Sequence, residues 1–141
     1  MKKIEWKDEY NLDISMIDRQ HQKLFDYLNI LRQGILEHNA IDAIKQGIQD
    51  LYDYGREHFS FEESLMKKGG FPILLEHIET HKSFNREIKT YQDRFEAGNE
   101  IMATDLILFI KNWLLNHILV EDRKYADFFR ENSFHCPEMD R

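Results

Sequence analysis

The residues best suited to chemistry are two pairs of side chains on either side of a Gly-Gly-Phe-Pro segment. His58 precedes Glu62 by four positions, and His77 precedes His81 by the same interval. Four residues turn an α-helix by about 400°, so the two members of each pair face the same way about 6 Å apart. The glycines at 69–70 and the proline after them indicate the end of one helix and the start of the next. Two helices that meet there would direct both pairs into a common space, where a helical bundle can hold metal ions.

Histidines recur on the inward faces of other predicted helices. The chain contains seven histidines, and five of them lie on apolar stripes that point toward a helical core. These five are His21, His58, His77, His81 and His117. Burying so many imidazoles costs several kcal/mol each unless something binds them, and a metal ion does so. The other two, His38 at a helix end and His135 near the C-terminus, are expected to face solvent.

Spacing alone leaves the last carboxylate of this set ambiguous. Asp122 follows His117 by five residues, which turn a regular helix by about 500° and leave the two side chains roughly 140° apart. A wider π-type turn or a bend near residues 119–121 would bring Asp122 back to the His117 face, and such bulges often occur at functional sites. Glu121 competes with Asp122 for this role.

Two metal ions account for the ligand set better than one. Five imidazoles, two bridging carboxylates and a bridging oxygen species fill all but one of the roughly twelve positions of an octahedral pair. Zinc is usually four-coordinate and fits such a set poorly. Imidazole with carboxylate suits iron, and an open position beside iron suits dioxygen.

Apolar residues at intervals of three and four predict the helices that position these side chains. Helices are expected over residues 17–38, 39–68, 72–96 and from about 103 onward, followed by a helical segment at 120–132. Asn39 is the expected N-cap of the second helix, and Asn99 or Thr104 that of the fourth.

Short connections between these helices predict an all-α fold, an up-down-up-down antiparallel four-helix bundle. Residues 1–16 are expected to form an N-terminal arm that packs aromatic side chains on the bundle, and 120–132 a short C-terminal helical extension. Residues 1–132 would form one domain, and residues 133–141 a loose tail.

Composition narrows the class of protein. The chain has 141 residues, of which 42% are hydrophobic, with only two prolines and six glycines, so one helical domain is expected rather than a turn-rich β fold. A net charge of −7 argues against a nucleic-acid partner. The N-terminus lacks the apolar segment of a signal peptide, and the longest apolar stretch, 106–110, is too short to cross a bilayer. We therefore expect a cytoplasmic protein without membrane insertion, and the single Cys136 excludes an internal disulfide.

In this order the motifs resemble those of the hemerythrin-like family, in particular its single-domain bacterial members, the bacteriohemerythrins. The resemblance covers roughly residues 4–130 and includes the arm at 6–10. Its parts are a lone histidine at 21, HxxxE at 58–62, HxxxH at 77–81 and HxxxxD at 117–122.

The resemblance implies a non-haem di-iron centre, bridged by an oxo or hydroxo group, that binds dioxygen reversibly. His77, His81 and His117 would hold one iron, and His21 and His58 the other. Glu62 and Asp122 would bridge the pair, which favours Asp122 over Glu121. Dioxygen would occupy the open position on the second iron.

Four apolar residues near the ligands are candidates for an oxygen pocket that excludes water: Leu24, Phe59, Trp113 and Leu114. Ordinary core packing explains the same positions, and both roles are compatible.

The expected function is non-catalytic dioxygen binding for transport, storage or delivery, with an oxygen-consuming protein as a recipient. The chain is expected to be monomeric, with an oligomer as the alternative. Oxygen, redox or nitric-oxide sensing is a second hypothesis. A di-iron oxidase or peroxidase is a third, in which Tyr54 or Tyr125 would serve as a redox partner.

Overall fold

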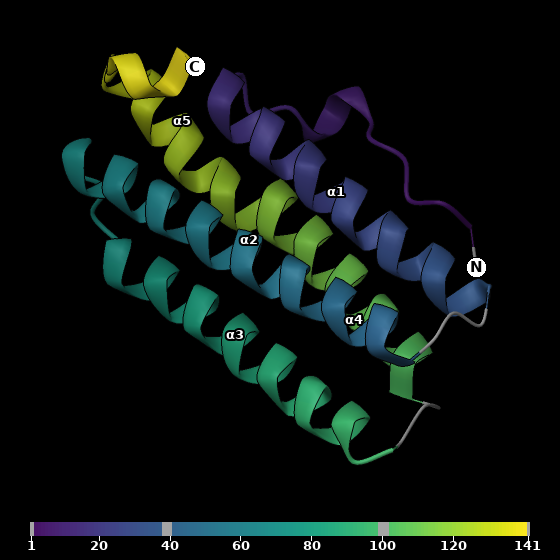
Figure 1. The fold of residues 1–141 in the computed structure, drawn as a ribbon. Coiled ribbons are helices and arrows are strands. Elements are labelled where there is room, and N and C mark those ends of the chain that lie inside the picture. Colours follow the sequence, from purple (N-terminus) through teal and green to yellow (C-terminus); the bar gives the residue numbers. More distant parts are fainter. Residues whose placement is uncertain (1, 38–40, 99–101, 141) are drawn as a thin grey trace.

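The computed structural model describes residues 2–37, 41–98 and 102–140, and its helices lie side by side as a bundle (Figure 1). The α-helices are α1 Ser15–Leu36, α2 Ile41–Lys68, α3 Leu74–Glu96, α4 Met102–Asn116 and α5 Arg123–Glu131. Helix α1 packs against α2 and α4, and α3 packs against the same two helices. None of the described residues forms a strand. The predicted all-α four-helix bundle is therefore confirmed.

Some helix boundaries differ from the prediction. Helix α3 begins at Leu74 rather than Pro72, because Ile73 has non-helical backbone angles (φ −109°, ψ 37°). Thr104 lies inside α4 and so is not its N-cap. His38, Asn39 and Asn99 lie outside the described residues. None of the described helices is both long and apolar enough to cross a membrane.

Two apolar clusters fill opposite ends of the bundle. The larger one joins the C-terminal halves of α1 and α3 to the N-terminal half of α2 and to α4. The smaller one joins the start of α1 and the end of α2 to α5 and the C-terminal segment. The predicted ligands lie between them: on α1, for example, His21 lies between Ile17 of the smaller cluster and Leu24 of the larger. Close packing at both ends holds this polar layer in place.

The N-terminal arm lies along α1 (Figure 1). Asn29 of α1 accepts a hydrogen bond from the backbone N–H of Ile4 and donates one to its carbonyl, each 2.8 Å long. The Trp6 ring contacts the rings of Tyr10 and Phe25 edge-on, at centroid distances of 5.4 and 5.2 Å. The arm thus covers the apolar face of α1 near the larger cluster.

The C-terminal residues do not form the loose tail that was predicted. Pro137–Asp140 form a 3-10 helix that packs against α1, and Met139 is buried in the smaller cluster. Lys68 also forms an ion pair with Glu138 at 3.2 Å. The apolar side chains in this segment cover the end of the bundle, which explains why it is ordered.

The turn between α2 and α3 depends on two glycines with different roles. Gly70 has a positive φ of 70°, and the N–H of Phe71 bonds to the carbonyl of Met66 at 2.9 Å, which closes the end of α2 in a Schellman motif. Gly69 has no such backbone requirement, but a Cβ there would overlap the ring of Phe129 from α5. Gly69 therefore allows α5 to approach the turn.

We predict that Gly69→Ala and Gly70→Ala destabilise the protein for different reasons. Gly70→Ala should cost about 1 kcal/mol through backbone strain alone, because a Cβ there meets no neighbouring atom within 4 Å. Gly69→Ala should cost about 1 to 3 kcal/mol through overpacking. Denaturant unfolding gives the free energy of unfolding of each single variant and of each glycine variant combined with Phe129→Leu. The comparison separates backbone strain from overpacking. Phe129→Leu should reduce the stability loss caused by Gly69→Ala but not the loss caused by Gly70→Ala. If the losses add to that of Phe129→Leu for both glycines, the proposed overlap is contradicted.

Candidate metal centre

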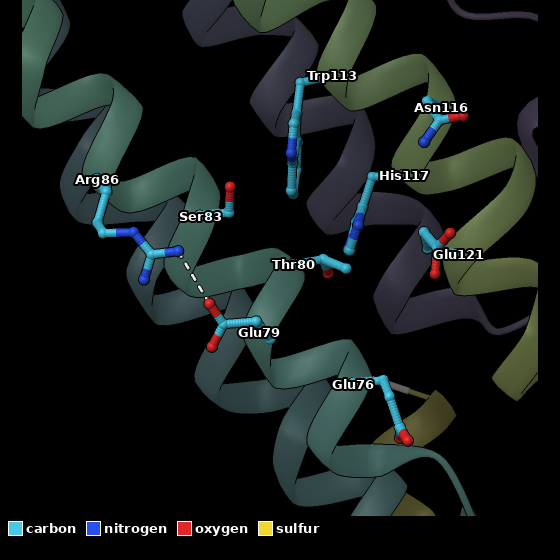
Figure 2. Close-up of a pocket in the computed structure, with 9 residues that line it drawn as sticks. All are labelled: Glu76, Glu79, Thr80, Ser83, Arg86, Trp113, Asn116, His117 and Glu121. Carbon is cyan, nitrogen blue, oxygen red and sulfur yellow. Dashed lines mark hydrogen bonds and ion pairs between the residues drawn. The ribbon is translucent and has the colours of Figure 1, made fainter.

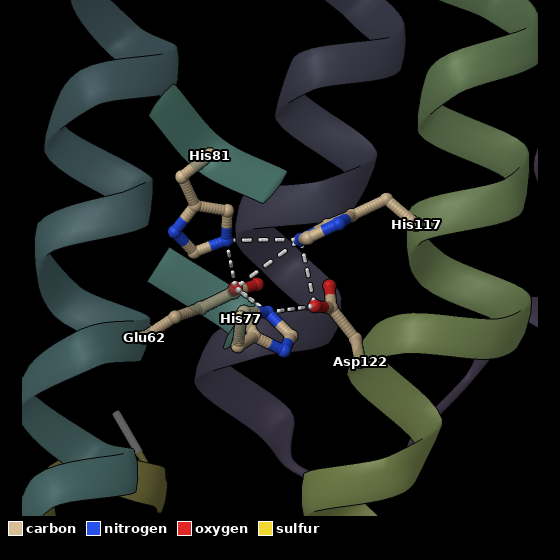
Figure 3. Close-up of side chains that lie close together, drawn as sticks. All are labelled: Glu62, His77, His81, His117 and Asp122. Atoms are coloured by element: carbon tan, nitrogen blue, oxygen red, sulfur yellow. Dashed lines mark hydrogen bonds and ion pairs between the residues drawn. The ribbon is translucent and has the colours of Figure 1, made fainter. Parts of the chain in front are cut away.

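All seven predicted ligands converge in the polar layer between the two clusters. Figure 3 shows five of them pointing toward one another, with Glu62 on α2, His77 and His81 on α3, and His117 and Asp122 on the segment after α4. His21 from α1 and His58 from α2 complete the set. Each of the seven residues is at most 2% exposed. The centre is therefore shut off from bulk solvent on four sides by helices.

The donor atoms form two overlapping groups that share both carboxylates. One group contains His77, His81 and His117, and the other contains His21 and His58. Glu62 and Asp122 belong to both groups, and within each group the donor atoms lie within 4.8 Å of one another. Two shared carboxylates between a three-histidine and a two-histidine group are the arrangement needed to bridge two metal positions.

The inward atoms are close enough to share a cation. Nε2 of His58 lies 2.6 Å from Oε1 of Glu62, and Nε2 of His117 lies 2.8 Å from Oδ1 of Asp122. Nε2 of His21 lies 2.9 Å from the other Asp122 oxygen. Nε2 atoms of His81 and His117 lie only 3.0 Å apart. Nitrogen lone pairs gathered this closely call for a proton or a metal ion between them.

A π-helical segment explains how Asp122 reaches the site. His117–Asp122 form a π-helix between α4 and α5, in agreement with the wider turn considered from the sequence. A π-helix has more residues per turn than an α-helix, so a residue five positions on returns to the same face. Glu121 faces away and forms an ion pair with Lys124 at 3.3 Å. The structure therefore places Asp122, and not Glu121, in the centre.

Several buried imidazole nitrogens and carboxylate oxygens contact one another at ion-pair distance but form no hydrogen bond among the described residues. They include Nε2 of His58, Nε2 of His77, Oε2 of Glu62 and both carboxylate oxygens of Asp122. Buried polar atoms are rarely left in this state, because each one forfeits its interaction with water. A mixed set of imidazole and carboxylate donors suits first-row transition metals. The residues present thus fit a metal pair.

The electrostatics of the layer favour positive charge at its middle. Burial by itself would lower the pKa of His21 and His77, but the neighbouring carboxylates of Asp122 and Glu62 outweigh it and raise both to about 9. Burial opposes ionisation of Glu62 and Asp122, yet the surrounding histidines hold the pKa of both carboxyls below their ordinary values. Burial lowers the pKa of His58. Without metal, protons supply positive charge that bound cations would supply instead.

The four residues predicted to line an oxygen pocket lie in or against the larger apolar cluster. Leu24, Phe59 and Leu114 are buried, and Trp113 is half-buried. The Phe59 ring stacks on His81 at 4.0 Å, and the Trp113 ring stacks on His117 at 4.3 Å. These contacts fix the planes of two predicted ligands and exclude water from their faces.

Trp113 and His117 also line a surface cleft of about 360 Å³ between α3 and α4 (Figure 2). Its rim is acidic and carries Glu76, Glu79 and Glu121, of which Glu79 forms an ion pair with Arg86 at 2.9 Å. Trp113 and His117 therefore form the wall between this surface cleft and the buried centre.

Two residues that touch the ligands from outside were missed in the sequence analysis. Oε1 of Gln20 lies 2.6 Å from Nδ1 of His58, and Oε2 of Glu63 lies 2.8 Å from Nδ1 of His81. Both contacts cross between helices, so no spacing within one helix reveals them. The only signal was position, since each residue adjoins a predicted ligand in the sequence.

The chain is similar to known proteins over most of its length. A family model described as the hemerythrin HHE cation binding domain matches residues 12–129. A bacteriohemerythrin of Stenotrophomonas maltophilia is 36% identical over 124 residues, which cover 86% of this chain and 78% of that protein. A bacteriohemerythrin of Clostridium acetobutylicum is 31% identical over 126 residues, covering 86% of this chain and 98% of the relative. The solved structure of a wild-type hemerythrin matches with a TM-score of 0.80 at 28% identity, covering 89% of this chain and 97% of that one.

We predict that Asp122 and its neighbour Glu121 respond differently to removal of charge. Asp122→Asn should leave fewer than two iron ions per chain, because a neutral amide bridges two cations poorly. Glu121→Gln removes the same charge one residue away, outside the centre, and should retain both ions. Iron per folded chain, measured after anaerobic loading and desalting, distinguishes them. Equal iron content in the two variants would contradict the assignment of Asp122.

Proposed function

The chain belongs to the hemerythrin family, and we propose that it binds dioxygen reversibly at two iron ions held between its helices. The observation that carries this proposal is the pair of buried donor groups that share Glu62 and Asp122. By position, three histidines would hold one iron (His77, His81 and His117) and two would hold the other (His21 and His58). The smaller donor set, with two histidines instead of three, would leave room for dioxygen beside the second iron.

Bound ferrous iron would supply the electrons and the open position that dioxygen requires. The chain's own contribution is to fix the donors and limit the negative charge. With five neutral imidazoles and only two carboxylates, the centre is poorer in electrons than a carboxylate-dominated one. We infer that this favours release of intact dioxygen over cleavage of its O–O bond.

The apolar residues next to the ligands would keep water away from bound iron. Water and protons promote irreversible oxidation of ferrous iron, and a dry site suppresses it. Phe59 and Trp113 cover the faces of His81 and His117, while Leu24 and Leu114 are buried in the larger apolar cluster that contains Phe59. We propose that these four residues form the oxygen pocket as well as part of the core.

A second candidate function is oxidation of a reductant at the same centre, and Tyr125 is the observation that favours it. Its ring lies 5.6 Å from that of His77, and burial together with the nearby Glu62 and Asp122 carboxylates raises the pKa of its hydroxyl well above the ordinary value. Tyr54, the other tyrosine considered, contacts Tyr27 and Lys23 instead.

Oxygen transport, storage or delivery to a recipient protein, a monomeric state and a cytoplasmic location remain predictions.

Repeated oxygenation tests the proposed function. The iron-loaded full chain is reduced without air, exposed to oxygen and then flushed with argon, while its visible absorption is followed. We expect a band that appears and disappears over several cycles, and Asp122→Asn loaded in the same way should show none. Irreversible oxidation with steady consumption of a reductant would favour the oxidase instead, and no response to oxygen would exclude both.

We predict that Trp113→Ala accelerates oxidation of the oxygenated protein by about tenfold, because it opens the wall between the cleft and the centre. Phe109→Ala is a matched control one helical turn away on α4, where the ring packs on Phe84 and Tyr91. It removes a comparable aromatic group without exposing a ligand. Autoxidation rates measured by the decay of the oxygenated band compare the two. Equal rates for Trp113→Ala and the parent chain would remove Trp113 from the pocket.

A further inference from the structure

The outer sides of two predicted ligands differ in charge. On His81 the Nδ1 atom lies 2.8 Å from a carboxylate oxygen of Glu63. On His58 the Nδ1 atom lies 2.6 Å from the amide oxygen of Gln20. The two contacts are otherwise alike, since each joins an imidazole to a half-buried side chain on a neighbouring helix.

Geometry assigns the direction of these hydrogen bonds. Nε2 of His58 lies 2.6 Å from Glu62, and Nε2 of His81 lies 3.2 Å from the same carboxylate, so both Nε2 atoms face the centre. An imidazole that offers Nε2 to a metal carries its hydrogen on Nδ1. Nδ1–H of His81 then donates to Glu63, and Nδ1–H of His58 donates to Gln20. The charged acceptor draws the proton more strongly and makes its histidine the better electron donor.

The charged contact and the neutral contact fall on different metal positions. His81 belongs to the three-histidine group and His58 to the two-histidine group. The buried Nδ1 atoms of His21 and His117 have no hydrogen bond within the described part of the chain. The difference between Glu63 and Gln20 is therefore not cancelled by an opposite contact at those two ligands.

We propose that Glu63 and Gln20 are positioning residues that make the two metal positions electronically unequal. This inference rests on the proposed function, in that it takes the metal pair to be iron. Glu63 acts through His81 to stabilise the ferric state at the three-histidine position. Gln20 holds His58 in place without adding charge. Iron at the two-histidine position, where dioxygen is proposed to bind, is therefore reduced to the ferrous state more easily. Easy return is what reversible binding requires.

Exchanging the two acceptors tests this proposal. Glu63→Gln removes the charge and keeps the hydrogen-bonding shape, while Gln20→Glu adds a charge at the other position. Both side chains are partly open to solvent, Glu63 to 31%, so either exchange should be tolerated. Glu79→Gln, an exposed carboxylate on α3, is a control for the loss of one negative charge elsewhere.

Anaerobic redox titration of the iron-loaded full chain gives the main measurement. A tenfold change in relative ferric affinity corresponds to about 59 mV for one electron. We expect Glu63→Gln to raise one of the two potentials by about that amount and Gln20→Glu to lower the other similarly. Glu79→Gln should leave both unchanged. In the zinc-loaded protein, the Nδ1 proton of His81 should shift upfield in the NMR spectrum of Glu63→Gln only.

The outcomes separate this inference from the proposed function. Variants that lose thermal stability or iron but keep both potentials would show a purely structural role and overturn the inference. Unchanged potentials in fully loaded variants would do the same, while reversible oxygen binding could still stand. Opposite shifts in a chain that oxidises irreversibly would support the inference and reject the carrier. A parent chain that retains no iron would overturn both.

Discussion

Five imidazoles and two carboxylates lie in the interior of this helical bundle, and the rest of the structure depends on how that polar layer is neutralised. Two buried carboxylates cannot remain ionised in an apolar core without nearby positive charge. The histidines provide it as protons in the metal-free chain, which is why the pKa values of His21 and His77 rise to about 9. Two metal ions would provide it more permanently and would also bind the imidazole and carboxylate atoms that form no hydrogen bond within the described residues.

The helices are arranged to tolerate this layer. Apolar clusters above and below it provide the burial that stabilises the fold, so the middle of the bundle can carry polar groups. The π-helical segment at 117–122 turns Asp122 inward while Glu121 stays at the surface. Phe59 and Trp113 stack on two of the histidines and link the polar layer to the larger cluster. A site held from several helices at once keeps its geometry when individual helix ends fray.

Much of this arrangement could be predicted because it follows from spacing within single helices. The four-residue intervals of His58 with Glu62 and His77 with His81 place each pair on one face, and apolar periodicity locates the helices. Asp122 could not be placed in this way, because its position depends on a local change of helix type that regular geometry excludes. Contacts between helices were equally out of reach. Glu63 was marked only by its place next to Glu62, which does not reveal its contact with His81, and Met139 gave no sign that the C-terminal segment would pack on the bundle.

The central claim is that these seven side chains hold two iron ions that share Glu62 and Asp122. Crystals of the iron-loaded protein, measured on both sides of the iron absorption edge, test it most directly. The account predicts two anomalous peaks in each chain, one bound by the histidines at 77, 81 and 117 and one by those at 21 and 58, with both carboxylates in contact with each peak. One peak alone, or peaks placed away from the two carboxylates, would contradict it.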